Sequence, residues 1–186
     1  MVGFEVNIPD DNVCPHCGNP SLELYDSNGN GFRFVLYVQG CIHACPGCQN
    51  PQTHDIDGGV LTTTENIIVA MSKMVTSLTK GITISGGEPF LQPEACAEIA
   101  RYVHTIKSSA VYPEDKHFDV WTYTGYTYEE LNKDPFASNP FVAKLLQETD
   151  YLVEGPYIQK LRDINLQFRG SSNQRILHLV NGLVVL

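Results

Sequence analysis

Long apolar runs and clusters of basic residues are both missing from this 186-residue sequence. No apolar stretch approaches the roughly 20 residues needed to cross a bilayer. The N-terminus, MVGFEVNIPDDN, has no basic region followed by an apolar stretch, so it does not match a secretory signal. Lysine and arginine total 12 against 21 acidic residues, a formal net charge of -9. Nucleic acids and anionic membranes select for basic patches. We therefore expect a cytoplasmic protein that binds neither.

Cysteine is the residue type that stands out. Disulfide frameworks are typical of small secreted chains, and tight cysteine spacing without a secretory signal indicates metal ligation instead. Cys96 stands alone on the apolar side of a predicted helix and is expected in the core, because free cysteine packs as a small hydrophobe. The other five fall in two tight groups, Cys14 with Cys17, and Cys41 with Cys45 and Cys48.

Strand and helix patterns alternate along the chain. Thr62 and Glu65 form a capping-box pattern that is expected to begin the first helix, which Gly81 is expected to stop. The pair Asn181-Gly182 between two apolar runs predicts a C-terminal β-hairpin. Strands are predicted at 32–39, 81–85, 118–122 and 151–153, and helices after 62, after Pro93 and around 141–146.

This alternation predicts an α/β fold with a mostly parallel sheet. Only four or five βα units fit, whereas a closed eightfold barrel needs about 250 residues. The economical expectation is an incomplete, open (βα) barrel that ends in the hairpin. Residues 1–31 are polar and turn-rich and are expected to form an N-terminal extension, with 32–186 as a single domain.

Cys41, Cys45 and Cys48 form a CxxxCxxC loop directly after the strand predicted at 32–39. Thiolates suit a soft metal centre, and structural zinc sites and ordinary iron–sulfur sites take four protein ligands. Three close cysteines therefore favour a [4Fe–4S] cluster with one iron left open for a substrate or cofactor. A zinc site completed by His43 or Cys14 is the alternative.

A second candidate segment is the turn SGGEP at 85–89, which follows the strand predicted at 81–85. Two glycines let the backbone approach a ligand, and the Glu88 carboxylate can bind an ammonium group. Ligands in such folds bind at the carboxyl ends of the parallel strands, so we expect this turn beside the cysteine loop.

The strand predicted at 118–122 ends at the same edge of the predicted sheet, beside the cysteine loop and the SGGEP turn. Alternation places Trp121 and Tyr123 on one face, where both are expected in the core. Thr124 and Gly125, at the turn after the strand, are expected to line the cavity.

The CxxxCxxC loop and the GGEP turn resemble those of the radical S-adenosylmethionine (SAM) superfamily. The resemblance implies an open barrel of the radical SAM type and a [4Fe–4S] cluster on Cys41, Cys45 and Cys48, whose open iron chelates SAM. It implies that the reduced cluster cleaves a carbon–sulfur bond and releases a deoxyadenosyl radical. The residues expected to contact SAM are Gly47, Cys48, Gln49, Gly86, Gly87, Glu88 and Thr124.

Further segments resemble the activating proteins of anaerobic (class III) ribonucleotide reductases, and the resemblance runs from about Tyr25 to Ile176. It implies an oxidoreductase that takes a hydrogen atom from a glycine of the large reductase subunit. A low-potential donor such as flavodoxin or ferredoxin is expected to supply the electron that reduces the cluster. It also singles out Arg169, Asn173, Gln174 and Arg175 for docking to that subunit or contact with SAM. The segments are GCIHACPGCQNPQTHD at 40–55, DVWTYTGYTYEEL at 119–131, VEGPY at 153–157 and FRGSSNQRI at 168–176.

Other functions stay open on the sequence alone. Cys14 and Cys17, in CPHCG, look like half of a zinc ribbon, so a second metal and an unliganded thiol pair are both hypotheses. Alternatives within the superfamily are an activase of the pyruvate formate-lyase type, against which FRGSSNQR argues, and a small-molecule enzyme such as a carboxy-deazaguanine synthase. A zinc-binding adaptor without catalysis is the alternative from another class.

Overall fold

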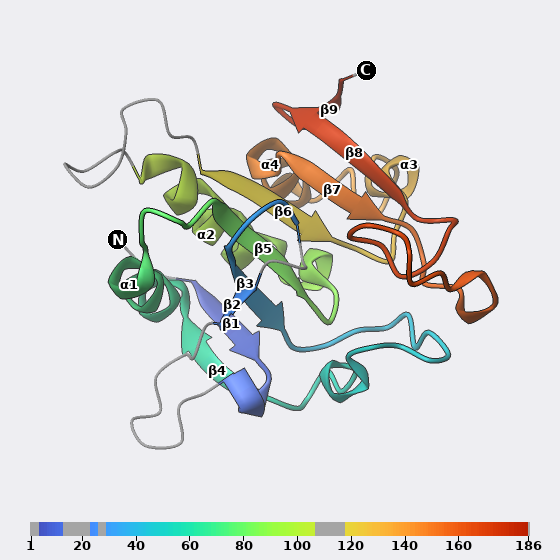
Figure 1. The fold of residues 1–186 in the computed structure, drawn as a ribbon, viewed down its shortest axis with the longest axis horizontal. Helices are drawn as coiled ribbons and strands as arrows, with labels where there is room; N and C mark the ends of the chain where they lie inside the picture. The colour runs from blue at the N-terminus through green and yellow to red at the C-terminus, as the bar shows by residue number, and fades with distance from the viewer. Residues whose placement is uncertain (1–3, 13–22, 26–28, 107–117, 186) are drawn as a thin grey trace.

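A computed structural model of the chain describes residues 4–12, 23–25, 29–106 and 118–185. Cys14 and Cys17, with the second metal site predicted on them, lie outside these ranges. Seven strands form one sheet in the order β2-β3-β5-β6-β7-β8-β9, and β1 pairs with β4 apart from it (Figure 1). The strands are β1 (Glu5–Ile8), β2 (Glu23–Tyr25), β3 (Arg33–Val38), β4 (Val60–Thr63), β5 (Gly81–Gly86), β6 (Asp119–Tyr123), β7 (Tyr151–Glu154), β8 (Arg175–Val180) and β9 (Leu183–Val184).

The centre of the main sheet is parallel. Strands β3, β5, β6 and β7 run in one direction, and β2 and β8 flank them antiparallel. Strand β9 turns back on β8, which confirms the predicted hairpin. Asn181 and Gly182 have φ angles of 51° and 79°, as a type I′ hairpin turn requires. The α/β class with parallel central strands is confirmed.

The helices follow the predicted pattern, with one correction at the first. The side chain of Thr63, not Thr62, caps α1 by accepting a hydrogen bond from the Asn66 amide, because β4 occupies the residues up to Thr63. Helix α1 ends at Met74, and Gly81 is the first residue of β5. The helices are α1 (Thr64–Met74), α2 (Pro93–Thr105), α3 (Tyr128–Leu131) and α4 (Pro140–Glu148), with short 3₁₀ turns η1 (Asp10–Asn12), η2 (Pro51–Thr53), η3 (Pro89–Leu91) and η4 (Gln159–Leu161).

One apolar core joins the sheet to α1, α2 and α4. Cys96 is fully buried in it, as predicted, and burial raises the pKa of its thiol to about 12. Val6 and Ile8 of β1 also lie in this core, so part of the segment 1–31 packs with the rest of the chain. None of the described helices is long and apolar enough to cross a membrane.

The fold brings two long loops to the same end of the sheet. The loop after β3 and the loop after β7 both extend from the carboxyl ends of their strands, cyan and orange-red in Figure 1. Parallel strands with ligand-binding loops at this end are the usual arrangement of α/β proteins. The candidate site is built there.

Candidate functional site

The cysteine loop begins where β3 ends. Ala44 and Gly47 adopt positive φ angles of 45° and 73°, and the Cys48 amide donates to the Cys45 carbonyl at 3.1 Å, so the backbone between these two cysteines makes a tight turn. Cys41, Cys45 and Cys48 are free, half-buried and part of the wall of one pocket.

The donor set is three soft thiols, which suit an iron–sulfur cluster. Within the described ranges, no three His, Cys, Asp or Glu side chains are gathered as the ligands of a single metal ion. His43, a candidate fourth zinc ligand, has its Nε2 atom 2.8 Å from a carboxylate oxygen of Glu88. Burial raises the pKa of the Cys41 thiol, so a bound metal centre would have to displace its proton.

The glycine turn lies directly against the start of this loop, as predicted. The amide of Gly87 donates to the Val38 carbonyl at 2.7 Å, and the amide of Glu88 donates to the Gly40 carbonyl at 2.8 Å. A Cβ atom on Gly87 would lie 2.2 Å from the Gly40 oxygen, so only glycine allows this approach. Gly86 and Gly87 both line the pocket.

Glu88 is fully buried, and its carboxylate binds groups of the protein. It accepts hydrogen bonds from the amides of Phe90, at 3.0 Å, and Gly125, at 2.9 Å. It also accepts from the hydroxyl of Thr124, at 2.9 and 3.0 Å, and contacts the His43 ring. The carboxylate therefore joins the cysteine loop, the glycine turn and the end of β6.

The end of β6 completes one wall. Thr124 and Gly125 line the pocket, as expected from the sequence. The core placement holds for Trp121, which is 4% exposed and stacks on Tyr151 with ring centroids 4.7 Å apart. It is wrong for Tyr123, which lines the pocket, because this residue stands at the last position of the strand.

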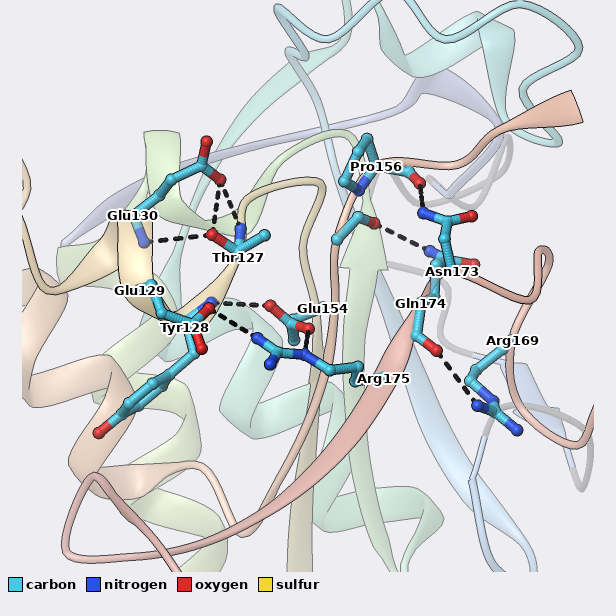
Figure 2. A network of polar contacts seen from close by, with 11 residues as sticks. Thr127, Tyr128, Glu129, Glu130, Glu154, Pro156, Arg169, Asn173, Gln174 and Arg175 are labelled. Atoms are coloured by element: carbon cyan, nitrogen blue, oxygen red, sulfur yellow. Dashed lines mark hydrogen bonds and ion pairs between the residues drawn. The ribbon is translucent and has the colours of Figure 1, made fainter. Parts of the chain in front are cut away.

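The segment FRGSSNQR folds the loop after β7 back onto its own strand ends (Figure 2). The Gln174 side chain accepts from the amides of Gly170 and Ser171, at 2.9 and 3.1 Å, and donates to the Gly155 carbonyl at 3.1 Å. Asn173 donates to the Pro156 carbonyl at 2.7 Å. Gln174 thereby fixes the loop and also lines the pocket.

The two arginines of this segment are also bound within the chain. Arg169 donates to the Gln174 carbonyl at 3.1 Å. Arg175 forms ion pairs with the buried Glu154 and, at 2.6 Å, with Glu129 (Figure 2). Glu154 also accepts from the Tyr128 amide at 2.7 Å. The residues predicted to dock a partner therefore hold the loop next to the pocket.

The predicted cofactor residues divide into two groups. Cys48, Gln49, Gly86, Gly87 and Thr124 line the pocket. Glu88 is fully buried, is not among the residues that line the pocket, and has its carboxylate bound by groups of the protein. Gly47 lies against Gln159, whose side chain would meet an added Cβ at 2.9 Å. The wall also contains residues that the sequence did not single out, Tyr37, His54, Gly155, Tyr157 and Gly170. All of these except Tyr37 stand inside segments already quoted, which was the available signal.

Comparison with known proteins agrees with this geometry. Residues 27–177 match the family model described as a 4Fe-4S single cluster domain. The anaerobic ribonucleoside-triphosphate reductase-activating proteins of Escherichia coli K12 and Haemophilus influenzae are each 37% identical, covering 82% and 81% of this chain and 92% and 90% of their own lengths. The protein of that name from Enterobacteria phage T4 is 34% identical over 84% of this chain and 90% of its own length. The chain belongs to the family of anaerobic ribonucleoside-triphosphate reductase-activating proteins.

Proposed function

We propose that this protein is a radical SAM activase that generates a glycyl radical on the large subunit of an anaerobic ribonucleotide reductase. The observation that carries the proposal is one pocket containing three free cysteines and a Gly-Gly turn at the carboxyl ends of parallel strands. When bound, a reduced [4Fe–4S] cluster supplies the electron that cleaves SAM into methionine and a deoxyadenosyl radical, which takes a hydrogen atom from glycine.

The protein's part is to hold and orient these groups. Cys41, Cys45 and Cys48 would hold the cluster as thiolates and leave a coordination position free for SAM. Gly86 and Gly87 line the pocket without side chains and would present their backbone to the methionine end of SAM. Glu88 contributes by fixing this turn to the end of β6, since its carboxylate is bound by Thr124, Gly125 and the Phe90 amide.

Gln49 and Thr124 line the remainder of the proposed SAM cavity. Gly47 acts through the loop, because its lack of a side chain lets Gln159 approach. For the fold, we propose an open barrel of the radical SAM type, in which β3, β5, β6 and β7 are the parallel strands. Such a barrel leaves a mouth through which a loop of another protein can enter.

The partner surface follows from the position of this mouth. We place docking of the reductase subunit on the loop between β7 and β8, whose shape Arg169, Asn173, Gln174 and Arg175 maintain. A low-potential flavodoxin or ferredoxin is the proposed electron donor, in the cytoplasm. Iron–sulfur potentials reach about −700 mV, low enough for a reduced cluster to carry out a demanding reduction.

The deciding experiment is anaerobic reconstitution with iron and sulfide, followed by reduction in the presence of SAM and the reductase large subunit. We expect four irons per chain, deoxyadenosine and a glycyl radical signal in the electron paramagnetic resonance (EPR) spectrum. Cys45→Ser should lose cluster and radical together. Cys96→Ala is the matched control and should keep both, because this thiol lies in the core away from the pocket.

Other outcomes point to the alternatives. Deoxyadenosine without a protein radical would reject the reductase as substrate and favour a small-molecule enzyme, and a radical on pyruvate formate-lyase alone would favour that activase. Zinc without iron, after anaerobic reconstitution, would favour the adaptor and reject the enzyme.

A further inference from the structure

His54 is a wall residue of the pocket that the proposed function does not use. It lies in the same pocket as Cys41, Cys45 and Cys48. Its Nε2 atom is enclosed and has no hydrogen-bond partner in the described part of the chain. A buried polar atom without a partner is uncommon in native structures and is explained by an ordered water or by a group bound in the site.

The backbone holds His54 firmly beside the first cysteine. The Cys41 amide donates to the His54 carbonyl at 3.2 Å, and the neighbouring Gly40 amide donates to the Thr53 carbonyl at 2.9 Å. Thr53 is fully buried, and its hydroxyl donates to the Asn50 carbonyl at 2.8 Å. The segment that follows the cysteine loop is thus pinned back onto the residues that begin it.

The same segment already donates to a cysteine sulfur at its other end. The amide of Asn50 lies 3.3 Å from the Sγ atom of Cys48. Hydrogen bonds to the sulfurs are one of the factors that set the potential of an iron–sulfur cluster. A second donor from this segment would act on the same centre.

We propose that His54 donates a hydrogen bond from Nε2 to a sulfur of the [4Fe–4S] cluster and thereby raises its reduction potential. One-electron reduction takes the cluster from the 2+ to the 1+ state, and the electron comes from the external donor. The added negative charge strengthens an N–H···S bond, so the donor stabilises the reduced state more than the oxidised state. His54 is a positioning and tuning residue, and it is not an iron ligand in this proposal.

The proposal is tested on reconstituted protein without SAM, by an EPR-monitored redox titration. His54→Phe keeps a planar ring and removes the donor, so its midpoint potential should shift to a more negative value. His54→Gln retains an N–H and should stay closer to the wild type. His178→Phe is the matched control, because His178 stacks on Tyr151 in the sheet, and should leave the potential unchanged.

A second reading comes from pulsed EPR of the reduced cluster. In protein labelled with ¹⁵N-histidine, we expect a weak nitrogen coupling and an exchangeable deuteron coupling in D₂O, both lost in His54→Phe. An equal potential and equal couplings in wild type and His54→Phe would overturn the proposal, and so would the strong nitrogen coupling of an iron-bound imidazole. If His54→Phe takes up no iron, the test is the weak ¹⁵N-histidine coupling in His54→Gln. Loss of that coupling in His54→Gln would support the hydrogen bond from His54 to the cluster, and its retention would overturn the proposal.

The inference rests on the cluster that the proposed function requires, but the two fail separately. The titration contains no SAM and no partner, so its result does not depend on SAM cleavage. Wild-type protein that holds a cluster yet yields no deoxyadenosine would reject the proposed function. A shift that occurs only when SAM is added would instead assign His54 to SAM and overturn the bond to the cluster.

Discussion

The buried arginine at the opposite end of β3 gives the sharpest stability prediction. Arg33 is fully buried and forms an ion pair with Asp119. Its guanidinium also donates to the Thr83 hydroxyl at 3.0 Å, and to the carbonyls of Ile82 and Asp119, each at 2.9 Å. The Cζ atom of the Arg33 guanidinium lies 5.6 Å from the centroid of the Trp121 ring. Arg33→Met removes every one of these donors while keeping an apolar stem of similar length.

The expected loss follows from what the substitution leaves behind. Breaking a buried ion pair by removing one partner costs about 3–5 kcal/mol, and the Ile82 carbonyl also loses its donor. Asp119 keeps some solvent contact, with 26% of its side chain exposed, which favours the lower half of that range. We therefore expect Arg33→Met to lower the free energy of unfolding by about 3–4 kcal/mol, a large fraction of the 5–15 kcal/mol typical of domains.

The assay is urea unfolding of the apoprotein under anaerobic, reducing conditions. Arg101→Met on the exposed side of α2 is the matched control and should stay within about 0.5 kcal/mol of the wild type. A loss below about 1 kcal/mol in Arg33→Met would refute the reasoning, because it would mean that the desolvation of the cation cancels its bonds. Folded Arg33→Met should still bind iron, since Cys41 lies beyond the other end of the strand.

Two further predictions concern a histidine bridge and the glycine turn. His104 lies 3.0 Å from both Asp150 and Glu148, and the bond to Asp150 is the main reason that the pKa of His104 is raised. This stabilisation is complete below the unfolded pKa of about 6.5 and is lost as pH rises through the folded value. The deficit of His104→Gln in urea unfolding should therefore be larger near pH 6 than near pH 9, and an equal deficit would contradict the assignment. In Gly87→Ala, the added methyl group should push the turn away from the Gly40 carbonyl, at a cost in strain of about 1–3 kcal/mol. We expect this to weaken SAM binding to the reconstituted protein. Unchanged binding would argue against the close approach of Gly87 to Gly40.

The sequence pattern predicted the central strands and the C-terminal hairpin, because neighbouring residues determine both. The central strands are continuous apolar runs, and the hairpin has its own turn signal at Asn181. The start of α1 was misplaced by one residue because three threonines follow one another there, and only the pairing of β4 with β1 selects Thr63 as the cap. That pairing joins residues far apart in the sequence, and no local pattern encodes it.

The same distinction holds for the site. The cysteines and the glycine turn were predicted because their spacing is itself the signal. The two carboxylates that hold His104 come from residues 44 and 46 positions away, so no local pattern pairs that histidine with them. Tyr123 was assigned to the core because alternation gives a face and does not say where the strand ends.

Glu88 shows how the distant parts form one pocket. Its carboxylate is held by donors from three segments, His43 in the cysteine loop, Phe90 after the glycine turn, and Thr124 with Gly125 after β6. A buried anion is tolerated only where hydrogen bonds compensate its lost hydration, so its charge requires all three segments to be in place together. The three strand ends are thereby fixed relative to one another by the protein itself. Such an arrangement supplies preorganisation, since the wall that receives a cofactor is already assembled by bonds that the cofactor does not have to make.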